Sequence, residues 1–451
     1  MKKILHWLDE NLEEFILVIF LIAMTLIMGI QIFCRYVLGM SLSWSEELTR
    51  YLFIWCGFLS VSYCSKKCLS IKIEQFVAIF PRRGKAIFKV VNHTFELIFF
   101  IYMIPFAYSY MMSSVHSGQL SPACGIPMYY VQAAPLVSFV LVAFRVLQRW
   151  IIEFRVARGE NVFDPAHPER NTPESFIQAN AESHNEPALE SGIDNRINTI
   201  NNSNEEEYYM PVVVLFIIFV VLLVIAVPVS ITLGITSVLP SVFDPSFTVG
   251  AKYLIRAMFG GLDSFPLLAV PMFVLSGIIM AKGGISKKLF DVFAYFLGKF
   301  TAGMPCAVIV TCLFYGAISG SAPATVAAVG SMTIPILSNL GYDLTFSTAI
   351  VAVAGGLGVI IPPSIPFIMY GMASGASVSD LFLAGIIPGL MIGALLMLYA
   401  IYHCKRYGED KEKIHAEVQM LHDKGLLKVL KESFFALLSP VIILGCIYTG
   451  V

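Results

Sequence analysis

Two long stretches, residues 300–342 and 344–379, contain no charged residue and are rich in glycine, proline and serine. In lipid, every backbone N–H and C=O group needs a partner within the protein, so irregular backbone survives at membrane depth only where it is buried or lines a cavity. Interrupted apolar segments are also the best sequence indication of the binding site in a secondary transporter. We therefore expect the chemistry of this chain to lie in these two stretches.

The composition indicates an all-α integral membrane protein in contact with lipid. The chain is 57% hydrophobic and only 14% charged, outside the range of soluble globular domains. Its net charge of -1 gives no reason to expect nucleic acid as a partner. The charge-free run 15–34 is long enough to cross a bilayer by itself.

Residues 1–156 are predicted to form a four-helix membrane domain. Its apolar segments cover residues 14–36, 46–65, 88–112 and 127–150. The loop after the second segment carries Lys66, Lys67, Lys72, Arg82, Arg83 and Lys85. The loop 113–126 has no Lys or Arg, so the positive-inside rule places it outside the cell and both ends of the domain in the cytoplasm.

Residues 157–207 are polar and rich in asparagine, which predicts a cytoplasmic linker. A second hydrophobic unit, 208–451, follows, and outside the broken stretches its apolar segments are 209–243, 264–281, 381–403 and 433–451. The charged segment 405–432 has apolar residues at helical spacing, which favours a helix along the membrane surface. Because the chain stops inside an apolar run at Val451, we expect it to be truncated.

The segment Gly355–Pro366, GGLGVIIPPSIP, is predicted to interrupt a helix. Proline has no N–H, so Pro362, Pro363 and Pro366 would release the carbonyl groups four residues earlier, among them that of Val359. Free carbonyl groups near the membrane midplane are a common cage for a sodium ion.

The segment Gly316–Thr325, GAISGSAPAT, is predicted to be the tip of a re-entrant helical hairpin. Its two apolar arms, 304–318 and 324–337, are each about 14 residues, shorter than the roughly 20 needed to span a bilayer. The hydroxyl groups of this tip are further oxygen ligands, from Ser319, Ser321 and Thr325. The helix that begins at the tip would direct free N–H groups at an anionic substrate.

Tight helix packing is the alternative explanation for these small residues, and it accounts well for Ala327, Ala328 and Gly330. It accounts poorly for three prolines that follow three glycines, so we favour an ion site. On that basis a Gly356→Leu substitution is expected to fill the space between the loop and the hairpin tip. Asp343 is the only carboxylate between 300 and 379, which favours sodium over protons as the coupling ion.

Other mechanisms receive less support. No phosphate-binding loop of the ATPase type occurs. An intramembrane enzyme would need a Ser–His or Asp–Asp pair, and the histidines between His93 and His403 are His116, His167 and His184, all in a loop or the linker. A passive channel or a purely structural membrane subunit remains open. Among the intramembrane charges, we expect Glu96 to pair with Arg145, and Asp263-Ser264 to cap the start of the helix that follows.

Several motifs carry a family resemblance. Trp44–Tyr51, WSEELTRY, together with Arg35-Tyr36 and Gly125–Met128, resembles the small subunit (Q) of tripartite ATP-independent periplasmic (TRAP) transporters. Leu262–Gly277, the Ser-Gly-Ser hairpin and the GVIIPPSIP segment resemble the large subunit (M). All but the linker is covered, and the motifs follow the family's order.

This resemblance implies a multi-pass protein of the bacterial inner membrane, in which a hairpin domain moves as an elevator against a scaffold that Q enlarges. It implies sodium (Na+) as the coupling ion, held by Ser319, Gly356, Val359 and Pro362. Ser321 and Ser364 would face the substrate, and we assign Thr325 to the substrate as well.

The resemblance also implies a periplasmic substrate-binding protein as partner and an organic-acid substrate. Fusion of Q to M is similar to the sialic-acid (N-acetylneuraminate) branch; a C4-dicarboxylate or other organic acid is the alternative. The family's M subunit has a second inverted repeat, so 208–451 would hold the first repeat only and would not transport by itself.

Overall fold

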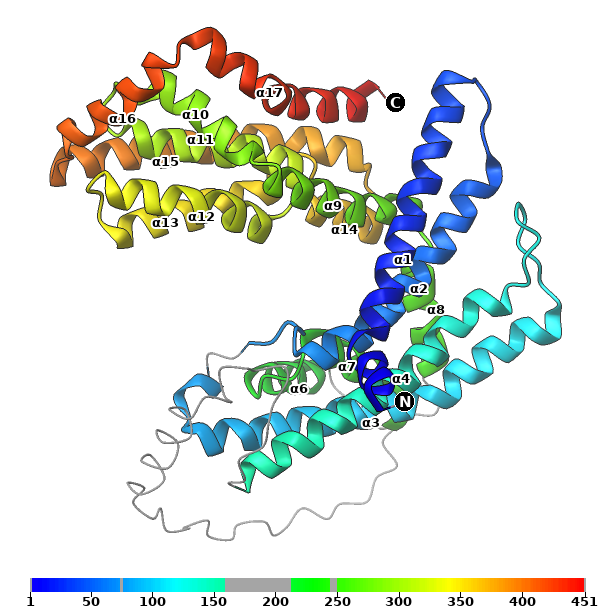
Figure 1. Cartoon of the computed structure of the whole chain (residues 1–451). Coiled ribbons are helices and arrows are strands. Elements are labelled where there is room, and N and C mark those ends of the chain that lie inside the picture. The colour runs from blue at the N-terminus through cyan, green and yellow to red at the C-terminus, as the bar shows by residue number, and fades with distance from the viewer. Residues whose placement is uncertain (1, 74–75, 159–211, 244–249, 450–451) are drawn as a thin grey trace, which may run out of the picture. The chain divides into compact units, whose positions relative to one another are not determined.

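The computed structural model describes residues 2–73, 76–158, 212–243 and 250–449 of the chain. Helices dominate these ranges, and within them the only β-type pairing is an isolated bridge between Leu120 and Pro127 (Figure 1). The chain divides into two compact units, Met1–Ser264 and Phe265–Val451. The all-α prediction is therefore confirmed.

The first unit begins with four helices, as predicted. These are α1 (Lys2–Val37), α2 (Ser43–Lys67), α3 (Arg82–Ser117) and α4 (Tyr129–Ala157). The first three extend beyond their predicted apolar segments at both ends, and α4 starts at Tyr129 and extends past 150, because backbone hydrogen bonding continues into the polar flanks. The helix α3 ends where Gly118 takes a φ of 62°, a left-handed conformation that glycine adopts without steric cost.

Helices α3 and α4 pack antiparallel to each other. Lys89 lies 3.4 Å from Glu153 at one end of the pair, and Ser114 donates to Gln132 at 2.7 Å at the other. Between these two ends, the rings of Phe100 on α3 and Phe139 on α4 form a tilted contact. Phe58 of α2 packs edge-to-face against Phe139. This geometry is the preferred one for aromatic pairs.

The described part of the predicted apolar segment 209–243 forms two helices, α6 (Val212–Val224) and α7 (Val229–Phe243). The chain turns at Ala226, whose φ is 66°, and its carbonyl accepts a hydrogen bond from Asn92 at 2.8 Å. Gly234 lets α7 approach α3, because a Cβ atom there would lie 2.6 Å from the Phe99 ring.

A further helix that the sequence did not predict, α8 (Ala251–Leu262), completes the first unit. Side chains of α6, α7 and α8 share one hydrophobic core with α2, α3 and α4. The compact unit therefore ends at Ser264, well beyond the boundary at 208 that composition suggested. The predicted linker 157–207 lies almost entirely outside the described residues.

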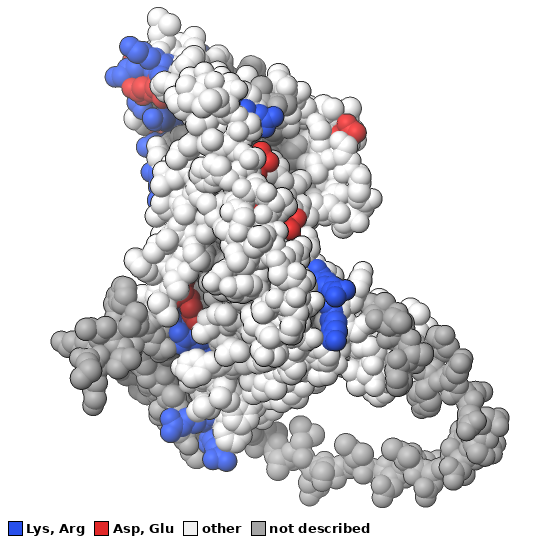
Figure 2. All heavy atoms as spheres, turned by 90° about the vertical axis from the view of Figure 1, so that its right-hand side faces the viewer, with Lys and Arg blue, Asp and Glu red and all other residues white. Residues whose placement is uncertain are grey.

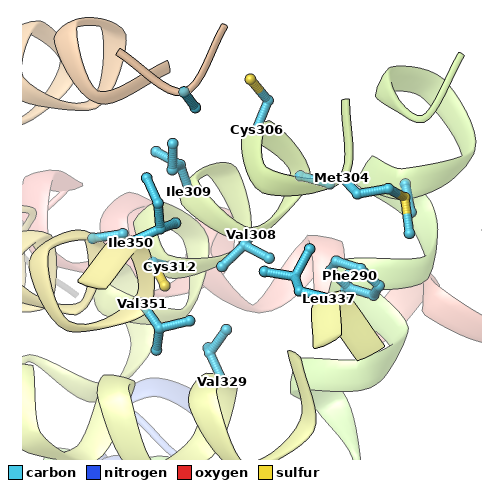
Figure 3. Packing of buried hydrophobic residues seen from close by; sticks show 14 of the residues in the cluster. Phe290, Met304, Cys306, Val308, Ile309, Cys312, Val329, Leu337, Ile350 and Val351 are labelled. Carbon is cyan, nitrogen blue, oxygen red and sulfur yellow. The ribbon is translucent and has the colours of Figure 1, made fainter. Parts of the chain in front are cut away.

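The second unit contains the two broken stretches. It comprises η3 (Phe265–Leu268), α9 (Ala269–Lys282), α10 (Ile285–Leu297), α11 (Gly303–Ser319), α12 (Ala322–Asn339), α13 (Leu344–Gly355), η4 (Gly356–Val359), α14 (Ile365–Ser374), α15 (Val378–Tyr407), α16 (Lys411–Asp423) and α17 (Leu426–Thr449). Every residue of α11 except Val310 and Phe314 is buried. A helix that is apolar on all sides belongs at the centre of a unit. Around it lie Phe290 of α10, Leu337 of α12 and Ile350 of α13 (Figure 3).

The structure of this unit differs from the sequence prediction in two places. The helix α10 was not predicted, because only one of its faces is apolar. The segment 405–432 is not one surface helix: α15 extends to Tyr407, α16 is separate, and α17 begins at Leu426. Ile414, Val418 and Leu421, the apolar stripe of α16, pack into the core of the unit, so this stripe is covered by protein.

Among the described residues, six helical segments are long and apolar enough to cross a membrane, by length and composition. They are Asn11–Val37, Gly84–Ser117, Tyr129–Ala157, Phe265–Lys282, Val378–Tyr407 and Leu426–Thr449. Most of the surface in Figure 2 carries no charged side chain, and large apolar side chains such as Leu26 and Leu395 are about 60% exposed. A surface of this kind is stable in lipid, where exposed apolar groups cost nothing.

Candidate functional site

The helical hairpin predicted in the first broken stretch is present. Helices α11 and α12, of 17 and 18 residues, are joined only by Gly320 and Ser321. At 1.5 Å per residue each arm is about 26 Å long, a little short of the roughly 30 Å hydrocarbon core. The re-entrant position of the hairpin in the membrane stays a prediction.

The second stretch is a broken helix, also as predicted. The helix α13 gives way to the short 3-10 helix η4, and the chain then turns through Ile360–Pro363 before α14 begins. Pro362 and Pro363 cannot donate to the carbonyls of Gly358 and Val359, which ends helical hydrogen bonding at this point.

Three glycine contacts join the hairpin tip to this broken segment. A Cβ atom on Gly316 would lie 2.6 Å from the Cα atom of Gly358, so the two backbones touch. Gly358 in turn faces Thr325, whose Oγ1 would lie 2.5 Å from a Cβ atom there. Gly320, with a φ of 62°, lies against the Pro363 carbonyl, and its own carbonyl accepts a hydrogen bond from the Ile365 N–H at 3.4 Å.

The steric argument for Gly356 is wrong. No atom lies within 4 Å of a Cβ built at Gly356, because η4 turns this residue away from the hairpin and turns Gly358 toward it. The close approach that was expected at Gly356 therefore occurs at Gly358. The role of the Gly356 carbonyl as a sodium ligand stays a prediction.

The predicted hydroxyl groups of the hairpin tip do come together. The side-chain oxygens of Ser319 and Thr325 lie 2.9 Å apart, and both residues are fully buried. Thr325 also donates to the Ser321 carbonyl at 2.9 Å. The tip thus holds several neutral oxygens in a small volume next to Gly358, and such oxygens are the ligands that a hard cation prefers.

Ser364 has a structural role in this conformation. Its hydroxyl donates to the Val359 carbonyl at 2.6 Å and accepts from the Phe367 N–H at 3.4 Å, which caps α14. Ser364 is fully buried. The bond to Ser364 fixes the orientation of the Val359 carbonyl, one of the predicted sodium ligands, and leaves its second lone pair available.

Asp343, the one carboxylate between residues 300 and 379, lies at the start of α13 and outside the hairpin tip. Its side chain accepts a hydrogen bond from the Phe346 N–H at 3.0 Å. That bond holds the pKa of the Asp343 carboxyl below its ordinary value. Asp343 is therefore a helix cap in its ionised form.

The predicted pairing of Glu96 with Arg145 is wrong, because each of these residues has another partner. Arg145 donates to Glu13 at 2.7 Å, and Glu13 also accepts from Ser62 at 2.9 Å. Glu96 lies 3.2 Å from the ring nitrogen of His93, the neighbour one turn away. These contacts tie α1, α2 and α4 together inside the unit.

Comparison with known proteins assigns the two halves of the chain separately. Residues 216–451 match a family model described as the tripartite ATP-independent periplasmic transporter, DctM component. Residues 24–156 match the DctQ component of these transporters.

Three similar proteins illustrate the range of relatives. The chain is 34% identical to the isethionate TRAP transporter permease protein DctMQ of Oleidesulfovibrio alaskensis, over 99% of this chain and 66% of that protein. It is 29% identical to the sialic acid TRAP transporter permease protein SiaT of Haemophilus influenzae, over 98% of this chain and 68% of that protein. It is 37% identical to the C4-dicarboxylate TRAP transporter large permease protein DctM of Vibrio cholerae, over 54% of this chain and 52% of that protein. The chain thus spans between 52% and 68% of the length of these relatives.

Proposed function

We propose that this chain, which belongs to the tripartite ATP-independent periplasmic (TRAP) transporter family and carries its DctQ and DctM components in one polypeptide, is the permease of a sodium-driven importer of an organic acid anion. It is a multi-pass protein of the bacterial inner membrane. The proteins it matches are transporters and not enzymes.

The observation that carries this proposal is the contact between the hairpin tip and the Pro-Pro segment. Two interrupted helical elements meet there through Gly316 and Gly358, with the buried hydroxyls of Ser319 and Thr325 beside them. Broken helices that face each other supply both carbonyl oxygens for a cation and helix N-termini for an anion. The helix α12 begins at Ala322, so its first N–H groups lie at this tip.

We assign sodium to the oxygens of Ser319, Gly356, Val359 and Pro362, and the substrate anion to the side of Ser321, Thr325 and Ser364. Ser321 is the most accessible of the three substrate residues, since Thr325 and Ser364 are fully buried. Ser321 would then meet the substrate first, and Thr325 and Ser364 would hold the surrounding backbone in place.

For the mechanism we propose an elevator in which residues from Phe265 onward move and Met1–Ser264 stays fixed. The hairpin and the Pro-Pro segment both belong to the unit Phe265–Val451. The helices α6, α7 and α8 of the DctM part instead share a core with the DctQ part. This division supports a scaffold made from both components.

The substrate is an organic acid anion delivered by a periplasmic binding protein. We propose N-acetylneuraminate, isethionate and a C4-dicarboxylate as the candidates to compare. The fused arrangement does not select sialic acid, because the isethionate relative matches this chain over both of its parts.

The proposed function is tested in proteoliposomes that contain the transporter with both repeats of its DctM part, together with the purified binding protein. We expect concentrative uptake of one of the three anions, and only when external sodium and the binding protein are both present. Uptake that never exceeds equilibrium would indicate a channel. Uptake without the binding protein would contradict the tripartite mechanism.

A further inference from the structure

The polar motif at the start of α2, WSEELTRY, lies outside the proposed transport site, and the structure shows where its side chains go. Glu47 is 4% exposed, and its Oε2 accepts hydrogen bonds from the Ala123 and Cys124 N–H groups, both at 2.8 Å. The Tyr51 hydroxyl donates to the other carboxylate oxygen of Glu47 at 2.6 Å. Glu47 therefore holds the loop between α3 and α4 against α2.

Arg50, one turn further along α2, has a different partner. Its Nη1 lies 3.1 Å from Oδ1 of Asp263, the residue that follows the last turn of α8. The predicted role of Asp263 as the start of a helix is wrong, because it ends α8 and uses its carboxylate for this ion pair. The pairing joins a residue of the DctQ-like part to one of the DctM-like part.

The end of α8 is also held by packing. A Cβ atom on Gly57 of α2 would lie only 3.0 Å from Leu262 Cδ1, so this glycine makes room for the leucine. The Phe259 ring lies 5.6 Å from that of Tyr110. Leu262 and Asp263 are thus held by α2 immediately before the chain leaves the first compact unit, which ends at Ser264.

We propose that Arg50 is a positioning residue for transport: through Asp263 it fixes the scaffold end of the connection to the hairpin-bearing unit. This inference rests on the proposed function, in which that unit moves while Met1–Ser264 stays in place. A moving unit needs a fixed point where its chain begins, and Asp263 lies two residues before Phe265.

The two side chains of the pair are 32% and 29% exposed, so the pair contributes little to the folding stability of the whole protein. Partly exposed ion pairs contribute about 0–1 kcal/mol to folding. Breaking the pair should therefore change the thermal unfolding temperature little, while it frees the residues that the pair holds.

A charge exchange tests the inference. We expect Arg50→Asp alone and Asp263→Arg alone each to lower initial sodium-driven uptake by about tenfold, a coupling within the range measured for contacting residues. The double variant Arg50→Asp/Asp263→Arg should return to within about threefold of the unmodified protein. Arg50→Lys, which keeps the charge, should retain most uptake, and Lys252→Glu on the exposed side of α8 should leave uptake unchanged.

Hydrogen exchange of residues 262–268 in the purified protein provides a readout that does not depend on transport. Exchange should rise in each single variant and fall again in the double variant. The inference would be overturned if both single variants kept the hydrogen exchange and the uptake of the unmodified protein. It would also be overturned if uptake in the double variant were no higher than in the more impaired single variant. Absence of uptake in the unmodified protein would contradict the proposed function instead, and the exchange measurement would still decide the role of Arg50.

Discussion

A Gly358→Leu variant should lose sodium-driven uptake almost completely. The added side chain would have to occupy space that Thr325 and the Ser321 carbonyl already fill, at 2.5 and 3.1 Å from the Cβ position. Forcing atoms into a packed interior costs about 1–3 kcal/mol, which corresponds to about a tenfold to hundredfold loss when the displaced groups form the site. Initial uptake rates in proteoliposomes measure the effect.

Two further variants make this result specific. Gly358→Ala should show a smaller loss in the same direction, and Gly445→Leu should have no effect, because nothing lies within 4 Å of a Cβ at that exposed position. Membrane insertion and monodispersity in detergent should be the same for all three. Normal uptake in Gly358→Leu would show that the hairpin and the Pro-Pro segment need not touch.

A Ser319→Ala variant should raise the sodium concentration needed for half-maximal uptake by about tenfold or more, the scale of loss when support for a metal ligand is removed. The hydroxyl of Ser319 is fully buried and lies 2.9 Å from that of Thr325. Thr325 keeps its bond to the Ser321 carbonyl in this variant, so its buried hydroxyl stays paired, and the Ser321 N–H loses only a 3.5 Å contact with Ser319. The main loss is then one oxygen of the proposed cation site.

Ser331→Ala is the matched control for Ser319→Ala. Ser331 belongs to the other arm of the same hairpin, is exposed, and makes only a 3.5 Å contact with the Ala328 carbonyl. Its sodium dependence should equal that of the unmodified protein. Equal sodium dependence in the Ser319 and Ser331 variants would exclude Ser319 from the ion site.

The long membrane helices and the hairpin were predictable because they follow from apolar length and from backbone chemistry. A charge-free run such as 15–34 has few alternatives to a membrane helix. The break between α6 and α7 was not predictable, because the turn at Ala226 depends on Asn92, a residue far away in the sequence. Helices α8 and α10 are short and amphipathic, so their sequences resemble loops that flank the longer apolar segments.

The sequence predicted where the candidate site lies but did not predict which of its residues contact one another. Gly355, Gly356 and Gly358 lie close together in the sequence, and the phase of the helix decides that Gly355 and Gly358 face the hairpin while Gly356 does not. One signal was available: Gly316 and Gly320 are four residues apart, so they lie on the same face of a helix. That spacing indicates one continuous surface of close backbone approach along the hairpin.

Charge partners were the least predictable feature. Glu13 lies outside the predicted first membrane segment, yet its carboxylate binds Arg145 of α4. Asp263 and Arg50 are more than two hundred residues apart in the sequence. Pairs of this kind depend on the packed arrangement of helices, which hydrophobic pattern alone does not specify.

Uptake driven by a sodium gradient, with the pH gradient collapsed by a protonophore, tests the central claim most directly. The proposed cation site consists of neutral oxygens at Ser319, Gly356, Val359 and Pro362, and Asp343, the one carboxylate between residues 300 and 379, caps a helix. Such a site has no group whose protonation could replace the ion, so uptake should persist and should follow the sodium gradient. Uptake that follows an imposed proton gradient in the absence of sodium would contradict the mechanism.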